Sequence, residues 1–104
     1  MRRGEIWWAD LPKPSGRRPV ALLSRDDAYR VRSAVTVAEV TTTVRNIPVE
    51  VLLSEKDGMP KACAINLDNI ITINKALLKE RICALSEDNI EAVSKAIKFA
   101  LDLD

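Results

Sequence analysis

The chain has 104 residues, of which 47% are hydrophobic and 30% are charged, a composition typical of a folded globular protein and not of a disordered one. It contains no histidine, the commonest general acid–base and metal-ligating side chain. Its two cysteines have neither zinc-site nor CxxC spacing, which favours small core residues in a reducing compartment. No apolar run approaches the length of a membrane span, and no signal-peptide segment follows the N-terminus. We therefore expect one domain, residues 1–104, in the cytoplasm, without metal, cofactor or membrane.

The charges are unevenly distributed, although the formal net charge is only +1. Residues 1–32 hold eight Lys or Arg against four Asp or Glu, whereas residues 86–104 hold five acidic residues against two basic ones. The N-terminal third can therefore present a basic surface to an anionic ligand.

The first part of the chain predicts two strands around a loop. Residues 5–9 alternate as a strand, which places Trp7 and Trp8 on opposite faces, one in the core and one at an interface or binding surface. Residues 10–16 contain two prolines and a glycine and predict a loop. The apolar run 20–23 predicts a buried strand.

The middle of the chain predicts a helical turn at 27–30 and an alternating strand at 35–40 that continues into Thr41, Thr42 and Thr43. A turn at 45–48 and a strand at 49–53 follow. Residues 54–60 contain Asp57-Gly58, which is typical of a hairpin turn.

The last part predicts two short apolar stretches, 63–67 and 69–73, separated by Asp68, then a brief helix at 74–78 and a strand at 81–85. Ser86 is an N-cap candidate for a helix over 87–101. The apolar face of this helix comprises Ile90, Val93, Ile97, Ala100 and Leu101. The sequence thus predicts a mainly β fold: a small, mostly antiparallel β-barrel or strongly curved sheet of five to seven strands, with a C-terminal amphipathic helix.

The chemistry available to this chain is limited to cations, hydroxyls and carboxylates. Arg17 and Arg18 precede a buried strand, and Arg18 should be extended because a proline follows it. A positioned guanidinium suits a phosphate or carboxylate ligand. RNA carries its own nucleophile, the 2′-hydroxyl, so a ribonuclease could use such an arginine with Thr41–Thr43 and Asp68 and no metal. Simpler interpretations stay open: a solvated basic turn, threonines on a strand surface and an aspartate in a turn.

Four segments, in this order, resemble motifs of the MazF/PemK toxins. They are residues 3–11 (RGEIWWADL), 18–24 (RPVALLS), 35–41 (VTVAEVT) and 66–73 (NLDNIITI). The resemblance implies a compact SH3-like barrel with a C-terminal helix, and a homodimer. It also implies a metal-independent endoribonuclease that cuts single-stranded mRNA at short sequences and is inhibited by a cognate antitoxin.

By position in these motifs, Arg18 matches the family's catalytic arginine and Thr41 its catalytic hydroxyl residue. Asn66 and Asp68 match positions that line the RNA groove, and Asp68 could assist proton transfer. Residues 11–17 match the mobile loop that covers the substrate. The complete set expected to bind RNA is Lys13, Arg17, Arg25, Thr42, Thr43, Asn66, Asp68 and Asn69.

The chain departs from the family pattern at Ala62-Cys63, where many relatives have Asp-Ser, so we expect a different base preference. An acidic antitoxin segment is expected to compete with RNA for the basic surface. Two other functions are considered. One is a non-enzymatic gyrase poison of the CcdB type. CcdB proteins act through residues of their C-terminal helix, typically including a terminal tryptophan, whereas this chain ends in Leu-Asp-Leu-Asp, which disfavours this function. A catalytically inactive RNA- or partner-binding barrel is the other.

Overall fold

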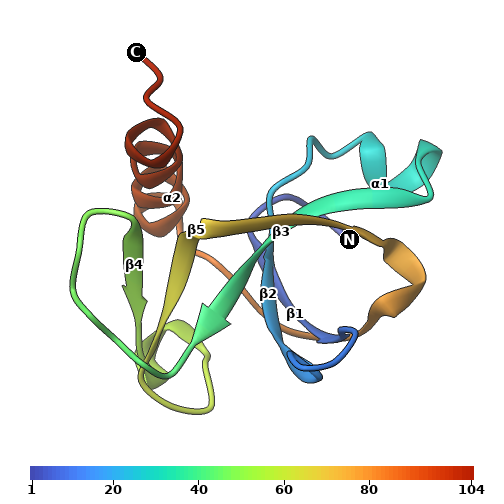
Figure 1. Ribbon diagram of the computed structural model, residues 1–104, viewed down its shortest axis with the longest axis horizontal. Helices are drawn as coiled ribbons and strands as arrows, with labels where there is room; N and C mark the ends of the chain where they lie inside the picture. Colours follow the sequence, from blue (N-terminus) through green and yellow to red (C-terminus); the bar gives the residue numbers. More distant parts are fainter.

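Six antiparallel strands form one curled sheet in the computed structural model, which describes residues 1–104 (Figure 1). Their order across the sheet is β4-β5-β3-β2-β1-β6. The strands are β1 (Glu5–Asp10), β2 (Arg17–Leu22), β3 (Ala34–Thr41), β4 (Glu50–Leu53), β5 (Cys63–Asn74) and β6 (Leu78–Ala84). The helical elements are α1 (Ala28–Val31), α2 (Glu87–Ala100) and the 3-10 turns Glu55–Asp57 and Lys75–Leu77. The predicted mainly β architecture with a C-terminal helix is confirmed.

The strand β2 begins at Arg17, three residues earlier than predicted. Arg17 pairs with Asp10 of β1, and Arg18 pairs with Ala9, so both arginines belong to the sheet and not to a flexible loop. The reason is the β1–β2 hairpin: the Leu11 N–H donates to the Gly16 carbonyl at 3.0 Å. This bond closes the connection and extends the ladder to its last residue.

Two predictions about the middle strands were wrong. The stretches 63–67 and 69–73 form one strand, β5, which passes through Asp68 without a turn. The ladder holds this strand extended because β5 pairs with both β3 and β4. Conversely, β3 ends at Thr41, because the Thr43 N–H donates to the Thr41 Oγ1 at 3.0 Å and turns the chain out of the sheet.

Each face of the sheet carries its own buried cluster. Val20 and Leu22 belong to one cluster and Ala21 to the other, as expected where successive side chains point to opposite faces. Helix α2 packs Val93 and Ala96 into the cluster that contains Ala21.

Ser86 caps helix α2 as predicted, since its Oγ accepts from the Asn89 N–H at 3.1 Å. Ile90, Ile97 and Ala100 pack against the core, but Leu101 is 56% exposed because the helix ends one residue before it. Neither helix has the length and hydropathy that crossing a bilayer requires.

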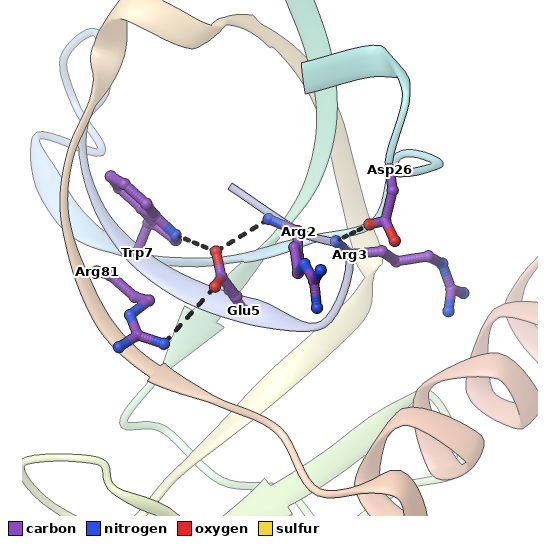
Figure 2. Close-up of polar contacts among 6 residues, drawn as sticks. All are labelled: Arg2, Arg3, Glu5, Trp7, Asp26 and Arg81. Atoms are coloured by element: carbon purple, nitrogen blue, oxygen red, sulfur yellow. Dashed lines mark hydrogen bonds and ion pairs between the residues drawn. The ribbon is translucent and has the colours of Figure 1, made fainter. Parts of the chain in front are cut away.

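A network around Glu5 ties the N-terminus to β6 (Figure 2). The Glu5 Oε1 accepts from the Arg2 N–H and from the Trp7 Nε1–H, each at 3.0 Å. The Glu5 Oε2 lies 3.6 Å from the Arg81 Nη1. We call Arg2, Glu5, Trp7 and Arg81 the Glu5 network; every oxygen of its carboxylate has a partner.

Candidate functional site

A polar groove of about 330 Å³ opens where β2, β3 and β5 approach the connection from β3 to β4. Nine of its ten lining residues are not hydrophobic. Six residues predicted from the sequence line this polar groove: Arg18, Thr41, Thr43, Asn66, Asp68 and Asn69. They come from segments as far apart as 18 and 69 in the chain, so the fold brings them together.

One side of the polar groove is built by alternation along β2 and β3. Val20 pairs with Glu39, and Arg18 lies two residues before Val20, so it is the diagonal neighbour of Glu39 on the same face. Thr41 lies two residues after Glu39 and shares that face. The Arg18 Nη1 lies 3.6 Å from the Glu39 Oε1, and the Arg18 Nε is buried without a hydrogen-bond partner. The guanidinium therefore keeps donors free for a ligand.

The other side is built by a bulge in β5. Ile65 pairs with Val40 and Ile70 pairs with Ala38, so the four β5 residues 66–69 stand opposite Glu39 alone. Such an insertion bends a strand and re-aims its side chains. Here it carries Asn66, Asp68 and Asn69 to the groove.

The lining of the polar groove is completed by the connection from β3 to β4, which Glu50 holds in place. The Glu50 Oε1 accepts from the Arg45 N–H at 2.9 Å and from the Asn46 N–H at 2.8 Å. Asn46 has a positive φ of 56°, a conformation that asparagine tolerates better than most residues. The two hydrogen bonds fix this loop, with Ile47, against the groove.

Four predicted RNA-binding residues lie outside the polar groove. Lys13 is exposed in the β1–β2 loop, and Arg25 is exposed between β2 and α1. Arg17 points away from Arg18, since neighbours on a strand face opposite sides. Its guanidinium carbon lies 5.1 Å from the centre of the Trp8 ring.

Thr42 borders a second, apolar hollow of about 90 Å³ instead, together with Trp8, Met59 and Pro60. Thr41 borders both the hollow and the polar groove. Trp8 is thus the tryptophan at a surface, whereas Trp7 packs against the buried cluster that contains Val20.

Four groove residues were not predicted: Glu39, Arg45, Ile47 and Glu50. Glu39 did leave a signal, because it is the one charged residue in the strand AVTVAEVT and stands two residues before Thr41. Arg45, Ile47 and Glu50 left none, since their positions depend on how the loop folds back.

The polar groove is not strongly basic, contrary to the basic surface that the N-terminal charges suggested. Its two arginines, Arg18 and Arg45, share the lining with the three carboxylates of Glu39, Glu50 and Asp68. No group of three or more Cys, Asp or Glu side chains in the structure could hold a metal ion. Specificity for an anion must therefore come from positioned donors and not from a large excess of positive charge.

Comparison with known proteins decides the family. Residues 2–101 match the family described as PemK-like, MazF-like toxin of type II toxin-antitoxin system. The chain belongs to this family. It is 40% identical, over 102 residues, to the probable endoribonuclease MazF5 of Mycobacterium tuberculosis, and the match covers 96% of this chain and 92% of that protein.

Solved structures of PemK/MazF toxins have the same fold. The Mycobacterium tuberculosis toxin MazF-mt6 superposes with a TM-score of 0.88 at 34% identity and covers 96% of this chain and 98% of its own. A mycobacterial endoribonuclease in complex with its cognate antitoxin gives a TM-score of 0.90 at 27% identity, over 100% of this chain and 97% of its own. The family and the endoribonuclease toxin function predicted from the sequence are confirmed.

Proposed function

We propose that the polar groove binds single-stranded mRNA and cleaves it at a short sequence without a metal ion. The 2′-oxygen attacks the adjacent phosphorus and expels the 5′-oxygen, which gives a 2′,3′-cyclic phosphate and a 5′-hydroxyl. The observation that carries the proposal is the position of Arg18 and Thr41 in one groove, on the same face of neighbouring strands.

Arg18 is proposed to stabilise the charge of the pentacoordinate phosphate. Its buried Nε has no partner within the chain, and its Nη1 makes a single long contact, 3.6 Å, with a Glu39 carboxylate oxygen. The N–H groups of the guanidinium are therefore available to phosphate oxygens. Donors aimed at developing charge supply much of the rate enhancement of such enzymes.

Thr41 is proposed to bind and orient the scissile phosphate. Its Oγ1 already accepts the Thr43 N–H at 3.0 Å, which leaves the hydroxyl hydrogen free to donate. A phosphate oxygen in the polar groove is the acceptor that this geometry favours.

Asn66, Asp68, Asn69 and Thr43 are proposed to contact bases and sugars. The Asn66 Oδ1 accepts the Asp68 N–H at 2.9 Å, so its amide group is held and can donate to a base edge. Lys13, Arg17 and Arg25, which lie outside the groove, are proposed to contact the backbone of a longer RNA.

The proposed partners are the RNA, a cognate antitoxin and a second copy of the chain. A relative has been solved with its cognate antitoxin, and we propose that an antitoxin here competes for Arg18 and Arg45 through acidic side chains. The proposed homodimer would act in the cytoplasm, where mRNA is found.

Incubation of the purified protein with a long single-stranded RNA in EDTA, followed by primer extension and end-group analysis, tests this function. We expect discrete cuts with 5′-hydroxyl ends that disappear in Arg18→Ala and weaken strongly in Thr41→Val. Thr42→Val is the matched control, because Thr42 lies outside the polar groove. Intact RNA, with a folded protein free of antitoxin, would contradict the proposal.

A further inference from the structure

We propose that Glu39 is the general base of the cleavage: its carboxylate takes the proton from the 2′-hydroxyl that attacks the phosphate bound by Arg18. This inference rests on the function proposed above and adds to it the group that activates the nucleophile. Sequence motifs did not indicate Glu39, and its role follows from its surroundings.

The first observation is that the side chain of Glu39 is largely covered but has few partners. Its side chain is only 14% exposed, and its one ionic contact is the Arg18 Nη1 at 3.6 Å. That distance is too long for a good hydrogen bond, and no other donor in the chain reaches the carboxylate. Glu39 lines the polar groove, and the lone pairs that the chain leaves free there are suited to a donor that arrives with the substrate.

The second observation is the place of Glu39 beside both proposed phosphate ligands. Arg18 is its diagonal neighbour across β2 and β3, and Thr41 follows two residues later on the same face, about 6.6 Å along the strand. The attacking 2′-oxygen belongs to the ribose next to the scissile phosphate. A base that adjoins both phosphate ligands is therefore suited to reach that oxygen, as general-base catalysis requires.

The other two carboxylates of the polar groove are less suited to this role. Glu50 already accepts the N–H groups of Arg45 and Asn46, so moving it would release the loop. Asp68 is exposed to solvent at the bulge of β5. Of the three, Glu39 is the carboxylate that is both largely covered, with 14% of its side chain exposed, and free to accept.

The step balances within the groove. As the bond from O2′ to phosphorus forms and the bond from phosphorus to O5′ breaks, the proton passes from O2′ to the Glu39 carboxylate. A water molecule protonates the departing O5′, and protonated Glu39 returns its proton to solvent when the product leaves. Arg18 keeps its protons throughout and supplies charge.

The test compares the pH dependence of cleavage by the wild type and by Glu39→Gln under single-turnover conditions, using a short RNA that contains the cleavage site. A carboxylate base makes the rate fall on the acid side of the profile, where it is protonated. We expect Glu39→Gln to lower the maximal rate by about 10²–10⁴-fold and to remove this acid-side fall, with little change in RNA affinity. Glu39→Asp keeps a carboxylate, so it should cleave faster than Glu39→Gln and should again show the fall of the rate on the acid side.

Two further variants separate the base from its neighbours. Asp68→Asn should retain the acid-side fall whatever its effect on RNA binding. Glu5→Gln replaces a carboxylate of similar burial, 13% exposed, outside the polar groove, and should retain the wild-type rate. Circular dichroism confirms that each variant is folded.

The outcomes are distinct. Wild-type cleavage combined with a Glu39→Gln profile that still falls on the acid side would overturn the inference and leave Glu39 as a positioning residue for Arg18. Loss of the fall in Asp68→Asn instead would assign the base to Asp68. Intact RNA with the wild type would overturn the proposed function itself.

Discussion

Two Arg–Glu pairs in this molecule have the same N–O distance but differ in how many hydrogen bonds the glutamate accepts. The Arg81–Glu5 and Arg18–Glu39 pairs both have closest N–O distances of 3.6 Å, and the two glutamates are 13% and 14% exposed. Glu5 accepts two further hydrogen bonds, from Arg2 and Trp7, whereas Glu39 accepts none. The first pair is completed by the protein, and the second is left open to a groove.

This difference separates a structural carboxylate from a functional one. A saturated carboxylate contributes to stability because its hydrogen bonds replace those to water. A carboxylate that lacks hydrogen-bond partners lowers the stability of the fold. Such residues occur at functional sites, where a ligand supplies the missing partner. Ion-pair distance alone would not have distinguished the two; the count of partners does.

The largest expected effect is on catalysis and comes from the arginines. Arg18→Ala should lower the maximal cleavage rate by at least about 10²–10³-fold, the loss typical for removal of a donor to a charged transition state. Arg81→Ala should keep the rate and change the free energy of unfolding by less than about 1 kcal/mol, since Arg81 is 56% exposed. Single-turnover cleavage and thermal melting of both variants check this, and equal rates in the two would remove the contrast.

The next effect is on stability and comes from the glutamates. Glu5→Gln should lower the free energy of unfolding by about 1–3 kcal/mol, because it weakens charge-assisted hydrogen bonds to Arg2 and Trp7. Glu39→Gln should change it by less than about 1 kcal/mol, as no hydrogen bond is lost. Urea unfolding of the two variants measures the difference; a larger loss in Glu39→Gln would mean that Glu39 is the structural residue.

Alkaline pH should act on the side of the Glu5 network. Tyr29 borders a surface hollow with Arg2 and Asp26, and burial raises the pKa of its hydroxyl from 10.0 to about 12. The folded state therefore holds this proton after the unfolded state has lost it, so stability is complete below pH 10 and falls between pH 10 and 12. The slope is at most roughly 1.4 kcal/mol per pH unit.

Tyr29→Phe provides the control for that prediction. It removes the titrating group, so unfolding free energies measured by urea at pH 9 to 11.5 should lose the part of the slope that belongs to Tyr29. An identical slope in the variant would show that another group governs alkaline stability.

The smallest expected effects come from the two thiols, one near the polar groove and one near the Glu5 network. Cys63 borders the apolar hollow beside Thr41, and Cys83 pairs with Ile6 next to Glu5. Burial raises the pKa of both thiols, so alkylation by iodoacetamide at neutral pH should be at least about tenfold slower in the native than in the unfolded protein.

Mass spectrometry of the alkylated protein separates the two sites. Cys83, which is half-buried, should react before Cys63, which is buried. Faster reaction at Cys63 would show that the groove end of the sheet opens more readily than the Glu5 side.

Much of the fold was predictable because periodicity is a local property. Neighbouring residues determine the alternation in β1 and β3 and the cap of α2 at Ser86. The β5 bulge is not determined in this way, because its four residues 66–69 come to stand opposite Glu39 only through the register with β3. Asp68 therefore looked like a turn residue in the sequence and lies in a strand.

The candidate site divides in the same way. Arg18, Thr41, Asn66 and Asp68 were indicated by motifs in their order along the chain. Glu39 left a local signal as the one charged residue of its strand, but its contact with Arg18 depends on the ladder. Arg45, Ile47 and Glu50 depend on a loop closed by a side chain that accepts two backbone N–H groups, which no spacing rule foretells.

The most direct measurement is a crystal structure of the wild-type protein with a short RNA that carries a 2′-deoxy nucleotide at the cleavage site, which blocks attack. We expect the scissile phosphate to lie within hydrogen-bond distance of Arg18 and Thr41 in the polar groove, with the C2′ edge of the preceding sugar facing Glu39. A scissile phosphate bound elsewhere, with the polar groove left to flanking nucleotides, would contradict this expectation.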